Sequence, residues 1–274
     1  MKLQVPWPSC LLSCALLLLA ITGNALLAAD SAAKPKPVLL YSLHYNAEGE
    51  NRYSPDGVYK EVLQRLRADF DVRVHSQPLT SKTLADVKLL FIANPNDKAF
   101  AANPLPPHVS PSDIETLTAF VRSGGGLILM ENQENHNLEV ADSNKLLACF
   151  GIQATNLYTD AKQLLLPKQT PVIGGLRWAY YTGNSLLLDS KHSAKPRALV
   201  TNDLYQKPIK GPRDAAGVLL AVAEPGKGRV AVATDSGWVC GWAFSGEGIG
   251  GVSIKEQDNW EIFRRLARWA AHVD

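Results

Sequence analysis

The sequence predicts a three-layer α/β/α fold, in which a mostly parallel sheet has helices on both faces and ends in a C-terminal β-hairpin and a terminal helix. One observation and one general rule support this prediction. Apolar strands alternate with amphipathic helices along the first half of the chain, which is the pattern of βαβ units. Right-handed crossovers between parallel strands then place helices on both faces of the sheet.

Four segments in the first half predict neighbouring strands. Residues 38–43 (VLLYSL) are almost continuously apolar, as expected of a strand covered on both faces. Residues 71–75 alternate between polar and apolar side chains, and residues 88–94 and 126–131 are again mainly apolar. Near the C-terminus, residues 217–235 form two alternating strands around a Pro-Gly-Lys-Gly turn, which predicts a hairpin.

Capping residues predict where the helices begin. Ser54 precedes a proline, which is typical of the first turn of a helix. Ser110 and Asp113 have the spacing of a capping box, and Asp258 has the same relation to a glutamate before the last helix. A short helix is expected over residues 144–150.

The N-terminus has the composition of an export signal. A basic start precedes an apolar run over residues 11–21, and small residues follow it. The run is too short for a comfortable membrane span. We therefore expect residues 1–29 to be a cleaved signal peptide, residues 30–37 a linker and residues 38–274 a single extracytoplasmic domain, periplasmic or secreted, with no membrane span.

Composition narrows the classes of partner. Charged residues make up 20% of the chain, the formal net charge is +2, and there is no basic stripe, so nucleic acid is not expected. The sequence also lacks a phosphate-binding loop, so no cofactor is expected. No metal-ligand spacing is diagnostic, so no metal is expected, and a divalent ion between Glu131, His136 and Asp235 stays open as an alternative. Cys149 and Cys240 both lie among apolar residues, and either a disulfide or two buried thiols would fit an exported protein.

Four segments, in this order, resemble the class I glutamine amidotransferase-like superfamily. They are ANP at 93–95, SPSDIETLTAFVRSGGGLILMEN at 110–132, GKGRVAVATDSG at 226–237 and DNWEIFRRLARW at 258–269. The chain looks most similar to a noncatalytic branch that includes ThuA-like proteins, β-galactosidase trimerisation domains and the N-terminal domain of an intraflagellar-transport protein. The resemblance implies a flavodoxin-like sheet.

The resemblance also implies which chemistry is missing. Enzymes of this superfamily need a cysteine on the turn after the strand that matches residues 126–131, activated by a histidine and a glutamate after a late strand. Here the turn carries Glu131, and the late strand ends in Thr-Asp-Ser-Gly. Cys149 and Cys240 lie elsewhere in the chain. Amidotransferase chemistry is therefore not expected.

Ligands of open parallel sheets bind beyond the carboxyl ends of the strands. The candidate catalytic residues expected at this edge are Glu131, Asp235 and His44. The candidate ligand-binding residues are Asn46, Asn94, Asn96, Asn132, His136, Ser236, Trp238 and Trp242. Aromatic side chains can stack on sugars while polar side chains bind their hydroxyl groups, which would suit a carbohydrate ligand. Two structural alternatives stay open. Asparagines after strands also close turns, and the tryptophans could instead cover the core.

Three functions remain open on the sequence. The favoured one is an exported, noncatalytic binding or assembly module whose ligand is a carbohydrate or an envelope protein. The alternative is a hydrolase of a glycan or ester, in which Glu131 or Asp235 acts as general base with His44, and this requires hydrogen-bond reach between them. The third is an interaction domain whose crevice is filled by its own tryptophans, which burial of Trp238 and Trp242 would favour.

Overall fold

The structure is a computed structural model. It describes residues 34–96, 98–132, 140–155, 159–160, 163–180, 182–201, 217–244 and 257–273. The fold lies in a compact unit that runs from Lys36 to Asp274 and is described by itself. The expected signal peptide lies outside the described residues. Over the part of the chain that is described, no helix has the length and apolar character needed to cross a bilayer.

The centre of the unit is a nine-stranded sheet in the order β2-β1-β3-β4-β13-β12-β10-β5, with β11 also paired to β12. Its strands are β1 (Val38–Ser42), β2 (Asp71–His75), β3 (Val87–Ala93), β4 (Gly126–Met130), β5 (Ile152–Ala154), β10 (Leu186–Leu188), β11 (Arg197–Thr201), β12 (Val218–Ala223) and β13 (Arg229–Ala233). The five strands from β2 to β13 pair in parallel, and the remaining pairs are antiparallel. This confirms the mostly parallel core and the predicted β12–β13 hairpin.

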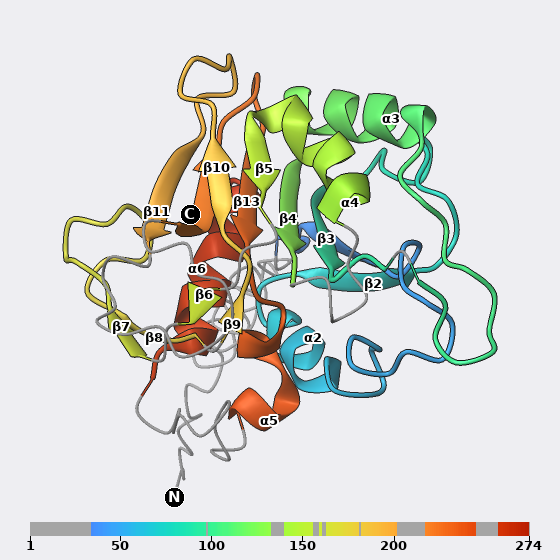
Figure 1. Cartoon of the computed structure of the whole chain (residues 1–274), viewed down its shortest axis with the longest axis horizontal. Helices are drawn as coiled ribbons and strands as arrows, with labels where there is room; N and C mark the ends of the chain where they lie inside the picture. The colour runs from blue at the N-terminus through green and yellow to red at the C-terminus, as the bar shows by residue number, and fades with distance from the viewer. Residues whose placement is uncertain are drawn as a thin grey trace, which may run out of the picture. The chain divides into compact units, whose positions relative to one another are not determined.

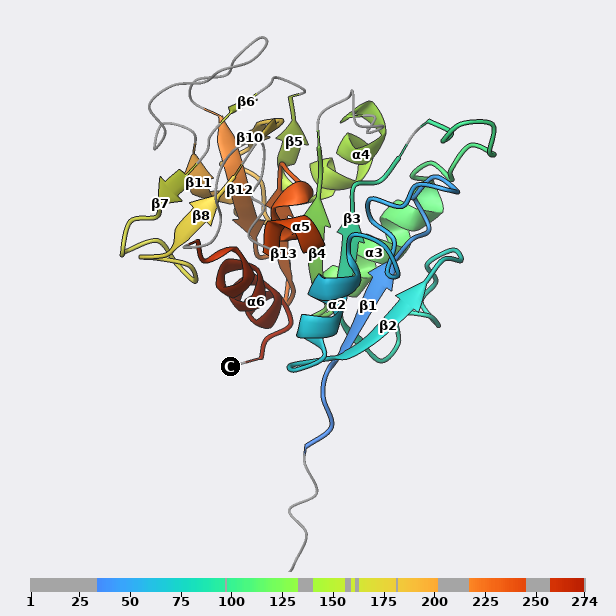
Figure 2. The same cartoon turned by 90° about the horizontal axis from the view of Figure 1, so that it is seen from below.

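Helices cover both faces of the sheet (Figures 1 and 2). The helices are α2 (Lys60–Leu66), α3 (Pro111–Arg122), α4 (Val140–Leu147), α5 (Gly241–Phe244) and α6 (Asn259–Ala270), with 3-10 turns η2 (Ala148–Phe150) and η4 (Gly237–Val239). Two small ribbons pair β6 (Thr159–Asp160) with β9 (Thr182–Gly183), and β7 (Gln163–Leu165) with β8 (Arg177–Ala179). The α/β fold class is as predicted.

The alternation of side chains along each strand divides the apolar interior into two cores. In β4, Ile128 and Met130 join the core beneath α2 and α6, whereas Leu127 and Leu129 join the core beneath α3 and α4. All four are buried. Because successive residues of a strand point to opposite faces, the same alternation decides where the side chains just beyond the strand are directed.

The predicted start of the first helix at Ser54 is wrong, because α2 begins at Lys60. The carbonyl of Ser54 instead accepts hydrogen bonds from the amides of Gly57 (3.2 Å) and Tyr59 (3.3 Å). A Cβ on Gly57 would lie only 2.4 Å from the Ser54 hydroxyl oxygen, so the segment is a tight turn that requires glycine. The serine marks a turn rather than a helix cap.

The other two capping predictions have different outcomes. The capping box of α3 is confirmed, since the Ser110 hydroxyl accepts from the Asp113 amide (3.2 Å) and the Asp113 carboxylate accepts from the Ser110 amide (2.8 Å). Asp258 does precede α6, but its carboxylate accepts from the amide of Arg177 (2.7 Å) and makes no cap. A long-range contact has replaced the local one.

Candidate binding site at the carboxyl edge of the sheet

Three predicted site segments meet at the same level of the sheet. Asn94 follows β3, Glu131 follows β4 and Thr234 follows β13, and the last residues of these strands are paired in register. The ladder continues one residue further, because the Asn94 amide donates to the Met130 carbonyl (2.7 Å) and the Glu131 amide donates to the Ala233 carbonyl (2.8 Å). The loops after these strands therefore start from a rigid base.

The structure does not bring the three candidate catalytic groups together. Strand alternation directs Glu131 to the α3/α4 face and Asp235 to the α2/α6 face of the sheet. His44 follows β1, which is three strands away from β13. At a spacing of about 4.8 Å per strand, the backbones of β1 and β13 are roughly 14 Å apart. Proton transfer between His44 and Asp235 needs direct or single-water contact, which this strand separation does not favour.

Glu131 is a carboxyl group in an apolar setting. It is fully buried, and neither carboxyl oxygen reaches hydrogen-bond geometry with any group in the described part of the chain. Burial raises its pKa to about 7, although the nearby Ser143 hydroxyl acts in the opposite direction. Near neutral pH the group is therefore divided between its neutral and ionised forms.

Asp235 and Cys240 lie together on the α2/α6 side. One oxygen of Asp235 accepts from the amide of Gly237 (2.6 Å), which is a turn-closing role. Cys240 is buried, and burial raises the pKa of its thiol well above the usual value, with a further rise from Asp235. A nucleophilic cysteine needs a lowered pKa. Cys149 and Cys240 are both free thiols, so the disulfide is not formed.

The predicted asparagines tie neighbouring loops to each other. The amide of Asn46 donates to the carbonyls of Ala93 (3.1 Å) and Asn94 (3.2 Å), which links the loop after β1 to the end of β3. The side-chain oxygen of Asn96 accepts from the amide of Ala47 (2.8 Å). These bonds fit the turn-closing alternative that the sequence left open.

Ser236 and Asn132 belong to a buried network that includes residues the sequence did not single out. The hydroxyl of Tyr59 donates to the Ser236 carbonyl (2.5 Å), and the amide of Asn184 donates to the Asn132 carbonyl (3.2 Å). Asn132 in turn donates to the hydroxyl of Tyr53 at 3.5 Å. No local pattern marks Tyr53, Tyr59 or Asn184, because their partners are far away in the sequence.

Trp238 lies in the core and not over a crevice. It is fully buried and makes edge-on contacts with Trp178 (centroids 5.2 Å apart) and Phe263 (5.8 Å). As placed, it has no exposed face on which a sugar could stack. The position of His136 and the side chain of Trp242 fall outside what the structure describes.

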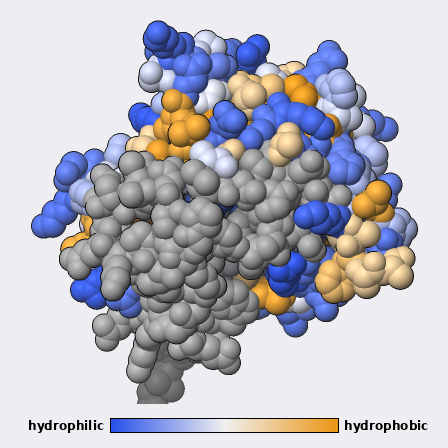
Figure 3. Space-filling view, viewed as in Figure 1, coloured by the Kyte–Doolittle hydropathy of each residue, from blue (hydrophilic) through white to orange (hydrophobic). Residues whose placement is uncertain are grey.

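An open cavity of about 530 Å³ lies beside the end of β1 and is called the edge cavity below. Its walls are the loop after β1, with His44 and Asn46, and the connection from β3 to α3, which contains Leu105 between prolines. Leu105 is 68% exposed, and Phe100, next to Gly49 of the rim, is 40% exposed. Hydrophobic side chains gather on this side of the molecule, at the right of Figure 3.

His44 lines the edge cavity together with two other titratable residues, Glu48 and Glu50. Burial lowers its pKa and the neighbouring His75 lowers it further, while Asp113 and the Ser76 backbone oppose the change. Its ring stands edge-on to Tyr45, with centroids 4.8 Å apart. His44 is thus a neutral hydrogen-bonding group at neutral pH. Within the described ranges, no three His, Cys, Asp or Glu side chains are grouped to hold a metal ion.

Comparisons with known proteins show which sequences and structures this chain is similar to. No protein-family model matches the chain. The intraflagellar transport protein 52 homolog of Mus musculus is 27% identical over 112 residues, which cover 41% of this chain. The match spans about a quarter (24%) of the length of the mouse protein.

Solved structures with low sequence identity share the architecture. The mmIFT52 N-terminal domain matches with a TM-score of 0.62 and 17% identity, covering 86% of this chain and 98% of that domain. The chain has the glutamine amidotransferase-like fold. A ThuA-like protein from Bacteroides uniformis ATCC 8492 shares this fold with a TM-score of 0.55 and 11% identity, over 89% of this chain and 94% of its own. The resemblance found in the sequence is confirmed at the level of the fold.

Proposed function

We propose that this protein is an exported, noncatalytic module that binds a protein partner of the cell envelope at the edge cavity. The observation that supports this most strongly is the division of the carboxyl edge into two halves. The half at β4 and β13 is filled by the chain's own buried side chains, among them Glu131, Trp238 and Ser236. The half at β1 and β3 is open and bordered by exposed apolar side chains.

The positions of the reactive groups support a noncatalytic role. Glu131 occupies the turn on which the enzymes of this fold carry their nucleophile, and it is sealed from solvent. Cys240 is buried with a raised pKa, so its thiol is neutral at physiological pH. His44 lies two strand spacings from β4 and three from β13. A general base needs direct or single-water contact with its partner.

A protein partner fits the rim of the edge cavity. Exposed apolar residues such as Leu105 and Phe100 are characteristic of protein contact sites when they border a cavity. The prolines around Leu105 limit the backbone freedom of this segment, so less conformational entropy is lost on binding.

A carbohydrate is the second candidate, and the polar lining of the cavity favours it. His44, Asn46, Ser54, Ser76 and Gln77 all line the cavity and can bind hydroxyl groups. Its volume of about 530 Å³ is within the usual range of small-ligand pockets. In this alternative the sugar would rest against Leu105 and the neighbouring prolines rather than against Trp238.

Site-specific photo-crosslinking in the native host separates these candidates. A photoreactive amino acid replaces Leu105, and a control chain carries it at the exposed Glu115 of α3. The proposal predicts a discrete protein adduct from position 105 that is absent from position 115. Thermal unfolding of the full chain with soluble glycan fragments provides the second arm, because a bound sugar raises the stability. A glycan-induced rise without any protein adduct would favour the carbohydrate.

Export is part of the proposal and has its own test. The chain is expressed with a C-terminal tag, and the N-terminus of the product recovered from the envelope or medium is determined by mass spectrometry. Cleavage close to residue 29 is expected from the small residues there. Recovery of an uncleaved chain from the cytoplasm would contradict export.

A further inference from the structure

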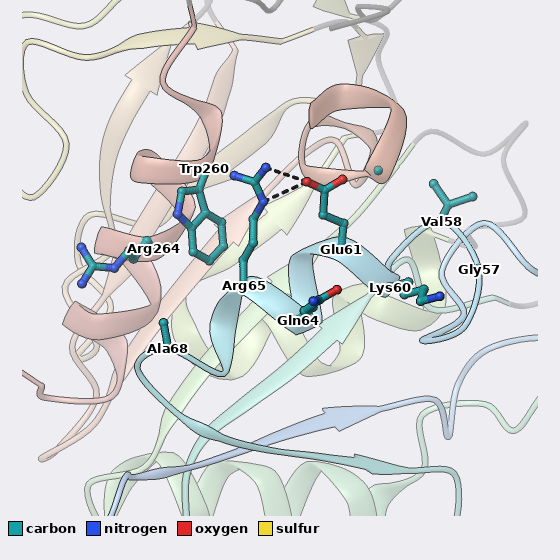
Figure 4. A pocket seen from close by; sticks show the side chains of 10 residues that line it. Gly57, Val58, Lys60, Glu61, Gln64, Arg65, Ala68, Trp260 and Arg264 are labelled. Carbon is teal, nitrogen blue, oxygen red and sulfur yellow. Dashed lines mark hydrogen bonds and ion pairs between the residues drawn. The ribbon is translucent and has the colours of Figure 1, made fainter. Parts of the chain in front are cut away.

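A second cavity lies between α2 and α6, on the opposite side of α2 from the sheet (Figure 4), and is called the α2–α6 pocket below. Its volume is about 830 Å³. One wall is the outward face of α2, with Lys60, Glu61 and Arg65, and the other is the start of α6, with Trp260 and Arg264. The indole of Trp260 stands between the two arginines. The two cavities share no lining residue, although Gly57 of this pocket is hydrogen-bonded to Ser54 of the edge cavity.

The lining of the pocket is predominantly cationic. Lys60, Arg65 and Arg264 contribute positive charges, and Glu61 contributes the negative charge among the lining residues. The side chains of Arg65 and Arg264 are 39% and 36% exposed, so both are accessible from solvent. The charge therefore favours an anionic ligand.

Arg65 is held in a fixed orientation. Its Nε and one terminal nitrogen donate to the same carboxylate oxygen of Glu61, at 3.0 Å and 2.6 Å. Its guanidinium carbon also lies 4.5 Å from the ring centre of Phe244 and 5.7 Å from that of Trp260. A guanidinium group has five N–H donors, so this arrangement leaves donors for a further acceptor. Little side-chain entropy remains to be lost on binding.

Arg264 is fixed by a different carboxylate. Its Nε and a terminal nitrogen donate to the two oxygens of Asp69, at 2.7 Å and 3.0 Å. Asp69 also accepts from Arg268 at 2.6 Å. Two arginines, each preset by a neighbouring carboxylate, thus flank the face of Trp260. This combination suits a ligand that offers planar anionic groups next to apolar surface.

We propose that the α2–α6 pocket binds a carboxylate-rich segment of a protein partner. Carboxylates match the planar donor fork of arginine in two-point contacts, whereas Lys60 adds a flexible point charge. The pocket is an open groove between two helices, which accepts an extended chain, and Trp260 supplies a surface for the aliphatic part of acidic side chains. This site is separate from the edge cavity and does not depend on the function proposed there.

Binding of a labelled peptide to the full chain tests this inference. The probe is a fluorescein-labelled peptide of six glutamates, followed by fluorescence anisotropy, with a six-glutamine peptide as the control for charge. Saturable binding of the glutamate peptide is expected, and it weakens as salt is raised. Arg65→Gln should weaken binding about tenfold or more, since it removes hydrogen bonds to a charged group. Lys60→Gln should weaken it about two- to fivefold.

Matched variants distinguish the pocket from general charge attraction. Arg73→Gln removes the same charge from an exposed arginine on β2 that also pairs with carboxylates, and it should leave the affinity unchanged. Trp260→Phe keeps an aromatic ring and should abolish any ligand-induced change in emission from that indole. Equal losses in Arg65→Gln and Arg73→Gln, or no saturable binding, would overturn the proposal. Tighter binding of a hexauronate, with the same dependence on Arg65, would overturn the assignment to a peptide.

Discussion

Replacing Glu131 with glutamine should change how the stability of the protein depends on pH. The pKa of Glu131 is about 7 in the folded chain, compared with an ordinary value of 4.5 for a glutamate, and burial is the main cause. The folded state therefore binds this proton more tightly than the unfolded state does. The resulting stability is fully present below pH 4.5 and is lost as the pH rises through 7.

The magnitude follows from the two pKa values. The difference between a pKa of 4.5 and one of about 7 corresponds to about 3.4 kcal/mol once the carboxyl is fully ionised. Between pH 5 and pH 8 the wild-type protein should lose about 2.5 kcal/mol through this group. Glu131→Gln has no such titration. The buried amide of the glutamine lowers the free energy of unfolding equally at every pH, by roughly 1–3 kcal/mol if it finds no hydrogen-bond partner. It does not make that free energy depend on pH.

Urea unfolding of the full chain at pH 5, 6, 7 and 8 measures this effect. The quantity of interest is the difference in unfolding free energy between wild type and Glu131→Gln at each pH, because other titrations cancel in the difference. Glu115→Gln, which removes an exposed carboxyl on α3, is the control for the loss of a surface charge. The reasoning is refuted if the difference stays constant from pH 5 to pH 8.

Three further substitutions test other contacts of the fold by the same unfolding assay. Trp238→Ala should cost about 3–5 kcal/mol, because it opens a large hole in the core, and a loss below about 1 kcal/mol would show that the side chain is exposed in solution. Asp69→Asn should cost about 1–3 kcal/mol at neutral pH through weaker bonds to Arg264 and Arg268. Burial raises the pKa of Asp69, but the two arginines outweigh it and lower the pKa overall, so this difference should shrink as the pH falls through the folded pKa. Gly126→Ala should cost at least about 1–3 kcal/mol, since the new Cβ would lie 2.3 Å from a backbone carbonyl oxygen at the end of α6, and an unchanged midpoint would contradict this contact.

The sequence predicted those parts of the fold that depend on neighbouring residues. The capping box at Ser110 and Asp113 and the β12–β13 hairpin are local, and the structure confirms both. The strands β5 and β10 have three residues each, so neither shows a readable alternation, and both are stabilised by partners distant in the chain. The turn at Ser54 differs from a helix start because of packing against Gly57, which no cap pattern reveals.

The sequence predicted where the candidate site residues lie along the strands, but not how they are arranged relative to one another. The sequence placed Glu131, Asp235 and His44 at the strand ends, which is where they lie. The order of the strands in the sheet and the alternation of side chains between its two faces then separate these residues. Strand order depends on pairing between distant segments, which no single segment encodes. Trp238 shows a related limit, because an aromatic residue beyond a strand has the same pattern whether it covers the core or faces a ligand.

The central claim is that this protein acts by binding at the edge cavity and not through Glu131. The most direct measurement is the yield of the protein adduct from a photoreactive residue at position 105, compared between the otherwise wild-type chain and the same chain with Glu131→Gln. The account predicts the same adduct in the same amount, because Glu131 lies buried on a different part of the edge. Loss of the adduct in Glu131→Gln, with the fold retained, would contradict it and return Glu131 to the functional site.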